Sequence, residues 1–247
     1  GLEPAGPLTF RAGPPTPGGA FAGFQIWGVV PRASGEQVTT LTRNGKVLGR
    51  RWAGKGFRLL TLASVDGASA DGRRPACPHC QSKNMFENAS GALAANDLAF
   101  PKVVRTWIYM ARILDWYGDF NRVRTAHYAR EGLRSGDLFP ASTGIQATSD
   151  GEECLMDVLA LDAEPGSGVS VRPVATSARQ DKAFSYGSAF SRATMLENRG
   201  SKTMYISGTA SSDKDGRSIH LEDPEAQVLD TLLCVAALLE AEGAGLE

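Results

Sequence analysis

Apolar and polar residues follow two different periods along the first two thirds of the chain. Compact segments rich in β-branched and aromatic residues are typical of strands, whereas apolar residues three and four positions apart are typical of helices. The predicted strands are a hairpin of residues 21–30 and 36–50 that turns near residues 31–35, followed by 57–65, 102–110 and 153–162. The predicted helices are 84–98 and 113–133. The order is therefore hairpin, strand, helix, strand, helix, strand.

A shorter second series follows the Gly- and Ser-containing linker at residues 164–170. Residues 203–211 form a strand-like run, and residues 224–242 predict a helix. Asp223 can cap that helix, Pro224 suits its first position, and Gly243 suits a left-handed stop. We expect an α+β fold with a first module at 1–165 and a partial second module at 166–247. The further strand, helix and closing strand of a complete second copy have no counterpart in the sequence.

The charge balance narrows the classes of partner. The chain has 247 residues, of which 42% are hydrophobic, so it can bury a sizeable core. Its 27 acidic and 26 basic residues give a formal charge of −1. This balance argues against nucleic-acid or membrane-surface binding through bulk charge. Because no apolar run reaches membrane-spanning length and no signal pattern opens the chain, we expect a cytoplasmic protein with a small-molecule partner.

Two of the four cysteines form the motif Cys77-Pro-His-Cys80. A structural zinc site needs a second pair of ligands at a matching spacing, and a redox motif is expected at the start of a helix that follows a strand. The flanking sequence "DGASADGRRPACPHCQSK" is typical of a polar loop. We therefore expect neither a metal nor another cofactor, and we interpret the pair as reduced surface thiols.

Four motifs in order resemble the chorismatases, a family of two-module enzymes related to the Rid (YjgF-type) proteins. They are "RTWIY" at 105–109, "FPASTGI" at 139–145, "YGSAFSRAT" at 186–194 and "ISGTAS" at 206–211. The resemblance covers about residues 84–243. It implies an enzyme that cleaves the enolpyruvyl ether of chorismate and releases pyruvate with a hydroxylated ring carboxylate. It also implies a homo-oligomer, in Rid-type proteins usually a trimer.

The resemblance places carboxylate-binding arginines at Arg105 and Arg192, because a guanidinium can bind a carboxylate through two hydrogen bonds. Alternatively, Arg105 is a surface residue of a half-exposed strand, and Arg192 forms a salt bridge between the modules. Tyr186 and Ser191 belong to the same motif as Arg192 and are expected to bind substrate. Aromatic packing would equally explain Tyr186.

The segment "FPASTGIQ" at 139–146 is predicted to be a ligand-binding loop. Ser142 and Thr143 offer hydroxyl donors, and Gly144 allows a ligand to approach the backbone. An ordinary polar turn is the alternative. Asp157, within the strand 153–162, is the candidate proton donor, since burial would raise the pKa of its carboxyl group. It could instead face solvent at a sheet edge.

Two departures from the family patterns leave other functions open. Chorismatases continue beyond the last predicted helix into strands with an essential glutamate, and this sequence ends at Glu247 without that segment. Rid deaminases have an arginine where this chain has Ser142, so imine hydrolysis is not expected. The alternatives are a Rid-like protein that binds a small carboxylate without turnover, and another biosynthetic enzyme on the same scaffold.

Overall fold

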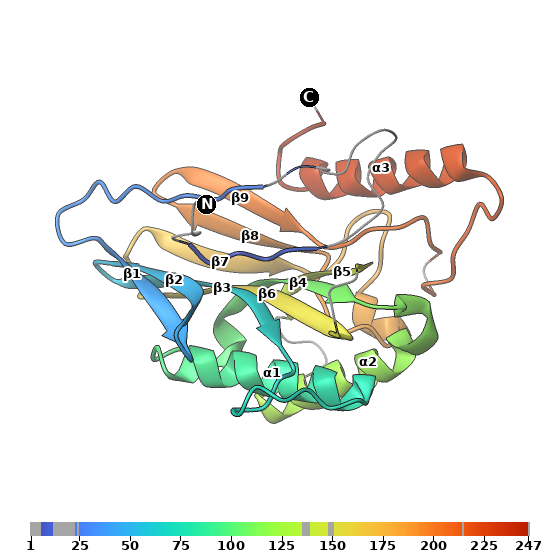
Figure 1. Ribbon diagram of the computed structural model, residues 1–247. Helices are drawn as coiled ribbons and strands as arrows, with labels where there is room; N and C mark the ends of the chain where they lie inside the picture. The colour runs from blue at the N-terminus through green and yellow to red at the C-terminus, as the bar shows by residue number, and fades with distance from the viewer. Residues whose placement is uncertain are drawn as a thin grey trace.

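The computed structural model describes residues 6–11, 23, 25–134, 139–147, 151–213 and 215–246. Its elements stack in four layers (Figure 1): two helices, a six-stranded sheet, a three-stranded sheet and a third helix. The predicted α+β class is confirmed. The division into modules at residue 165 stays a prediction, although the six-stranded sheet ends at Ala163 and the three-stranded sheet begins at Val169.

The six-stranded sheet has the order β1-β2-β3-β6-β4-β5, in which β4 and β5 are parallel and the other neighbours are antiparallel. Its strands are β1 Gln37–Arg43, β2 Lys46–Gly54, β3 Phe57–Asp66, β4 Val103–Met110, β5 Ala141–Gln146 and β6 Cys154–Ala163. The helices α1 Pro78–Ala94 and α2 Ile113–Arg130 cover one face of this sheet (Figure 1), and a 3-10 turn at Phe100–Lys102 precedes β4.

The second sheet has the order β7-β8-β9 and is antiparallel throughout. Its strands are β7 Val169–Val174, β8 Ala193–Asn198 and β9 Ser201–Ile206, with a 3-10 turn at Ala183–Tyr186 before β8. Alternate residues of these strands face opposite layers, so Leu196 packs against the six-stranded sheet and Ala193 packs against Leu238. Leu238 belongs to α3 Pro224–Glu240, which lies at one end of the outer face of this sheet (Figure 1).

The main core lies between the six-stranded sheet and helices α1 and α2. Met85 and Phe86 of α1 and Phe120 and Tyr128 of α2 are each at most 1% exposed. The Phe86 ring packs in a tilted arrangement against Phe120 and edge-to-face against Tyr128, and Met156 of β6 belongs to the same core. The apolar spacing that predicted both helices therefore marks the faces that the sheet buries.

The predicted hairpin is wrong in its position. The observed hairpin pairs β1 with β2 around Asn44 and Gly45, which have φ angles of 51° and 76°. Positive φ at both central residues is what a two-residue turn between twisted strands requires, and Asn-Gly meets it best. Residues 25–30 have no regular secondary structure, and residues 21, 22 and 24 lie outside the described residues. The sequence analysis predicted the turn at residues 31–35 and did not consider the Asn-Gly pair as a hairpin turn.

Other boundaries also differ from the prediction. Helix α1 begins at Pro78, six residues before the predicted start, because the Cys77 side chain caps it. The pair Cys77 and Cys80 therefore lies at a helix N-terminus and not in a loop. The predicted loop at 139–146 contains strand β5, and strands β7 and β8 were not predicted. The predicted strand 203–211 ends at Ile206.

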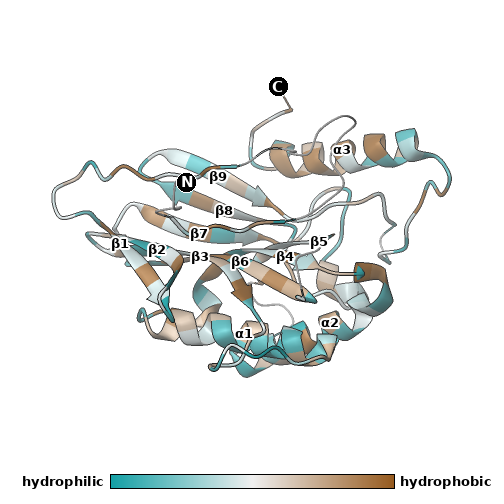
Figure 2. Cartoon of the chain, in the orientation of Figure 1, coloured by the Kyte–Doolittle hydropathy of each residue, from teal (hydrophilic) through white to brown (hydrophobic). Residues whose placement is uncertain are grey.

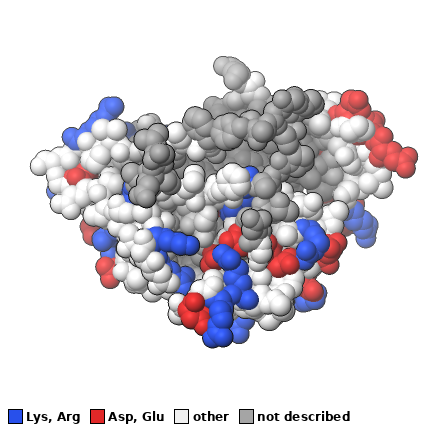
Figure 3. All heavy atoms as spheres, in the orientation of Figure 1, with Lys and Arg blue, Asp and Glu red and all other residues white. Residues whose placement is uncertain are grey.

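Charged side chains of both signs are interspersed over the helix layer on the face shown in Figure 3. Among the ion pairs of the described residues, Arg74 pairs with Asp66 and Glu152, and Arg112 pairs with Glu153. Within the described part of the chain, no helix has the length and apolar character needed to cross a lipid bilayer.

Candidate functional site

Strand β5 joins the two sheets. Its first residue, Ala141, pairs with Arg105 of β4 and forms a parallel bridge with Ser191, which precedes β8. The Ser142 N–H donates to Ser207 Oγ over 2.9 Å, and the Gly208 N–H donates back to the Ser142 carbonyl over 3.0 Å. The motifs that contain these residues are far apart in sequence and meet at this junction.

The hydroxyl groups of Ser142 and Thr143 lie on opposite faces of the sheet, because successive residues of a strand point in opposite directions. Ser142 faces the helix layer, where its Oγ accepts a hydrogen bond from Thr106 Oγ1 over 2.9 Å. Thr143 faces the three-stranded sheet, where its Oγ1 accepts a hydrogen bond from Arg105. The expectation that the two hydroxyls bind one ligand is therefore wrong for this geometry.

The other predicted site residues also lie on one or the other face of the sheet. Arg192, Tyr186 and Gly144 lie with Ser142 on the helix side, where a Cβ added to Gly144 would be 3.8 Å from the Tyr117 ring. Arg105 and Asp157 lie with Thr143 on the side of the three-stranded sheet. The proposed catalytic pair of Asp157 and Arg192 is thus separated by the sheet itself.

Two buried arginines lie beside the same aromatic ring on the helix side. Arg192 is 5% exposed and Arg124, from α2, is 2% exposed. Both guanidinium groups lie 5.7 Å from the centre of the Phe190 ring, and that of Arg192 lies 5.4 Å from the centre of the Tyr186 ring. We call Arg124, Arg192, Tyr186 and Phe190 the arginine cluster.

The hydrogen bonds of the cluster leave its positive charge uncompensated by any described carboxylate. Arg192 Nε donates to the Asp181 carbonyl over 2.8 Å, and Arg124 Nη2 donates to Asn121 Oδ1 over 2.7 Å. The Nε atom of Arg124 is buried without a partner, and neither arginine forms an ion pair within the described residues. Two buried cations without an acid favour binding of an anion at this position.

Tyr186 is the polar ring of the arginine cluster. Burial raises the pKa of its hydroxyl group, and nearby Arg192 partly offsets that effect. Gly216, at a φ of 79°, lies directly behind the ring, where an added Cβ would be only 2.6 Å from Cγ of Tyr186. Tyr186 and Phe190 are both half-buried, so the cluster reaches the surface through these two rings.

Arg124 is the residue that the sequence analysis missed. It lies four positions after Phe120 and so shares the buried face of α2. A charged residue within an otherwise apolar helical face was the available signal. The sequence analysis assigned the apolar residues of that helix and passed over the arginine among them.

Arg105 lies on the other face of the sheet, away from the arginine cluster. It is 5% exposed, and its guanidinium lies 5.0 Å from the centre of the Trp107 ring. Burial lowers the pKa of Arg105 to about 10, and its Nε and Nη1 atoms have no hydrogen-bond partner among the described residues. The alternative of a surface arginine is therefore excluded.

Asp157 is held by three donors. Its Oδ1 accepts hydrogen bonds from Thr9 Oγ1 over 2.5 Å and from the Ser64 N–H over 2.8 Å, and its Oδ2 accepts one from the Tyr109 hydroxyl over 3.4 Å. Burial raises the pKa of the Asp157 carboxyl group, and these hydrogen bonds oppose the rise. Arg11 covers the Tyr109 ring at 4.1 Å, so the N-terminal segment occupies the surroundings of this carboxylate.

Ser191 has a role in the junction. Its N–H donates to the Pro140 carbonyl over 3.2 Å, and its own carbonyl accepts a hydrogen bond from Ser207 Oγ over 2.5 Å. Its contacts connect the segment before β8 to β5 and to the end of β9.

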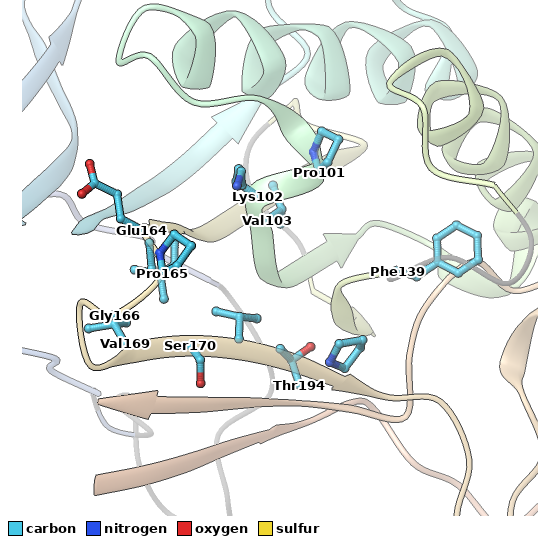
Figure 4. Close-up of a pocket in the computed structure, with 14 residues that line it drawn as sticks. Pro101, Lys102, Val103, Phe139, Glu164, Pro165, Gly166, Val169, Ser170 and Thr194 are labelled. Carbon is cyan, nitrogen blue, oxygen red and sulfur yellow. The ribbon is translucent and has the colours of Figure 1, made fainter. Parts of the chain in front are cut away.

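A separate cavity of about 430 Å³ lies where β4 begins and β7 turns away from the first sheet (Figure 4). Lys102, Glu164 and Thr194 contribute its polar groups, and Val103, Phe139 and Val169 contribute apolar ones. None of the eight predicted site residues lines it. No group of three or more His, Cys, Asp or Glu side chains suited to a metal ion occurs among the residues that the structure describes.

Comparison of the sequence with protein-family models and with curated proteins gives no match. Comparison of the structure gives partial similarity to solved Rid-type proteins. Protein YJGH is 18% identical with a TM-score of 0.42, covering 48% of this chain and 84% of that chain. Yeast Mmf1 is 14% identical with a TM-score of 0.42, covering 51% and 99%, and the E. coli YjgF gene product is 15% identical with a TM-score of 0.40, covering 50% and 91%.

Proposed function

We propose that this protein binds a small carboxylate metabolite of the chorismate type at the arginine cluster. The observation that carries the proposal is the meeting of Arg124 and Arg192 on the Phe190 ring, both almost fully buried and neither paired with a described carboxylate. Burying a guanidinium without an opposite charge is costly, so an anionic ligand that restores the balance is expected to bind with a large gain. Tyr186 and Phe190 supply aromatic surface for an unsaturated ring.

The sequence supports chorismate as the first ligand to test. Arg192 and Tyr186 lie in the motif "YGSAFSRAT", and Ser142 and Gly144 lie in "FPASTGI", so four residues of the chorismatase-like pattern face the same side of the sheet. Chorismate carries two carboxylates, and two arginines provide two forks for them. We expect the protein to act as a homo-oligomer, as the resemblance implies.

The test is calorimetric titration of the protein with chorismate, followed for three matched variants. Arg192→Met and Arg124→Met keep most of the side-chain volume and remove one charge each. Loss of a desolvated charge pair costs about 2–5 kcal/mol, so the dissociation constant should rise by at least about 30-fold in either variant. Arg122→Met is the control, because Arg122 lies on the same helix, is 76% exposed in its side chain and pairs with Asp119. Equal effects in all three variants would contradict the proposal.

Cleavage of the enolpyruvyl ether is the second candidate, and the raised pKa of Asp157 is the observation that favours it. A protonated Asp157 would donate to the methylene carbon of the enol ether, giving an oxocarbenium ion. Water would add to the carbon that carries the ether oxygen and lose a proton to the Asp157 carboxylate, and the resulting hemiketal would collapse to pyruvate and the ring alcohol. The same titration samples would then release pyruvate, and Asp157→Asn would abolish the release without weakening binding.

The positions of the groups favour binding without turnover over cleavage. Asp157 lies on the face opposite to Arg192, and Thr9, Ser64 and Tyr109 already occupy its oxygen atoms. Binding without pyruvate release therefore agrees with the first proposal. Pyruvate release that survives Asp157→Asn would require a different proton donor.

A further inference from the structure

The two cysteines at the start of α1 form a pair whose arrangement suits thiol–disulfide chemistry. Cys77 is the N-cap residue, and its Sγ accepts a hydrogen bond from the Cys80 N–H over 3.2 Å. Residues three apart at a helix start have Cα atoms about 5 Å apart, which lies within the range that a disulfide spans. Cys77 is exposed and Cys80 is half-buried, so a small reagent can reach the first thiol.

The electrostatic surroundings distinguish the two thiols. The Cys80 thiol donates a hydrogen bond to the Cys77 sulfur, and this bond together with the Cys80 N–H lowers the pKa of Cys77. The same thiol contact raises the pKa of Cys80, against a small opposing effect of Lys83. The first turn of α1 contains no acidic residue that would offset the positive end of the helix dipole. Cys77 thus has the properties of an attacking thiol and Cys80 those of a resolving thiol.

The scaffold holds this pair in place. Asn88 Nδ2 donates to the Asp66 and Ala68 carbonyls over 2.8 Å each, and Gln81 Nε2 donates to the Pro75 carbonyl over 2.7 Å. An added Cβ at Gly67 would lie 2.3 Å from the Gln81 carbonyl oxygen, so the incoming loop packs directly on the first turn of α1. Pro78 fixes the backbone between the two cysteines.

We propose that Cys77 and Cys80 form a reversible dithiol–disulfide centre that reacts with low-molecular-weight disulfides. The Cys77 thiolate attacks one sulfur of a disulfide RSSR, forms a mixed disulfide and expels RS⁻. Cys80 loses its proton and attacks the Cys77 sulfur, expelling the second RS⁻ and closing the Cys77–Cys80 bond. The two cysteine thiols are oxidised, RSSR is reduced to two RSH, and the two protons end on those thiols.

The sequence predicted reduced surface thiols in a polar loop, and the pair instead lies at a helix start. The sequence analysis required a helix start after a strand for a redox motif, and the structure meets that condition, since α1 follows β3. Cys154 and Cys234 are buried at 2% exposure each and serve as internal references. Burial raises the pKa of Cys234, which keeps it a poor nucleophile.

The experiment uses the whole chain and oxidised glutathione as the probe. After incubation, free thiols are blocked with an alkylating reagent, and intact mass and peptide mapping locate the modifications. We expect an intramolecular Cys77–Cys80 disulfide in the wild type, a stable glutathione adduct on Cys77 in Cys80→Ser, and no reaction at Cys80 in Cys77→Ser. Alkylation of the reduced protein at neutral pH should be faster at Cys77 than at Cys80.

The Cys77→Ser variant also separates chemistry from capping. Serine is a preferred N-cap residue, so this variant should keep the circular dichroism and melting temperature of the wild type while losing the disulfide. Overturning results would be equal alkylation rates at both cysteines, or a glutathione adduct that remains on Cys77 in the wild type without resolution by Cys80.

Discussion

The buried charge of Arg105 is expected to lower the stability of the folded protein. Arg105→Met replaces a 5% exposed guanidinium with an apolar side chain of similar length. Burial lowers the pKa of Arg105 from 12.5 to about 10. That difference corresponds to about 3 kcal/mol against the charged form in the folded protein. Loss of the hydrogen bond to Thr143 and of the contact with Trp107 offsets about 2 kcal/mol of the gain. We therefore expect the free energy of unfolding at neutral pH to rise by about 1 kcal/mol.

The pH dependence of stability gives an independent test of whether the Arg105 charge destabilises the folded protein. Arginine is charged in both folded and unfolded chains at neutral pH, so the full cost is present there. Between the folded pKa of about 10 and the unfolded value of 12.5, the unfolded chain binds more protons, and the stability of the wild type should rise with pH through that interval. The difference between wild type and Arg105→Met should therefore narrow as the pH rises above about 10.

Urea unfolding followed by circular dichroism measures both effects. Arg122→Met, at an exposed position, should change the free energy of unfolding by no more than about 0.5 kcal/mol. A loss of more than about 2 kcal/mol in Arg105→Met, with Arg122→Met unchanged, would show that the guanidinium stabilises the fold and would refute the reasoning.

Three further predictions concern other parts of the molecule. Gly216→Ala should lower the free energy of unfolding by about 1–3 kcal/mol and weaken chorismate binding, because the added Cβ would collide with the Tyr186 ring. The control is Gly72→Ala, at a φ of 82° with no atom within 4 Å of the added Cβ, which should lower the free energy of unfolding by less and leave chorismate binding unchanged. Burial raises the pKa of the Asp157 carboxyl group in the folded protein. In urea unfolding, the wild type should therefore lose stability relative to Asp157→Asn as the pH rises above the pKa of about 3.9 in the unfolded chain, and a gain in stability relative to that variant would contradict this prediction. Several turns of α3 are coloured hydrophobic in Figure 2, and four apolar side chains of this helix are exposed, namely Val228, Leu229, Leu232 and Leu233. These side chains should support self-association, so sedimentation should show a trimer that the combined Leu229→Glu and Leu232→Glu variant disrupts, and a wild-type monomer would exclude this prediction.

The sequence predicted those elements whose apolar period extends over several turns or a whole buried strand. The strand at 57–65 and the helix at 224–242 were located well, since Asp223 and Pro224 mark the helix start. The short strands β5, β7 and β8 escaped prediction. Each has six residues, and in β5 the pairing partners of Ala141 are Arg105 and Ser191, which lie 36 or more positions away in the chain. Such pairing is a tertiary property that local periodicity does not contain.

The roles assigned to the site residues stay predictions. The motifs pointed to Arg105 and Arg192 as carboxylate-binding arginines, and both are buried without a described carboxylate partner. The motifs did not show that Ser142 and Thr143 belong to a strand, and it is this strand that places their two hydroxyl groups on opposite faces of the sheet. Arg124 could not be linked to Arg192 from sequence, because the two meet only when α2 packs on the sheet.

In the proposed function, Arg124 and Arg192 bind one anion together. A double-mutant cycle of Arg124→Met, Arg192→Met and the combined variant, with chorismate affinity measured by calorimetry, tests it most directly. If both guanidinium groups contact the same ligand, the effects should not add, and the coupling free energy should be at least about 1 kcal/mol. Losses of binding free energy that add within about 0.5 kcal/mol, or no loss of affinity in either single variant, would contradict binding of one anion by both arginines.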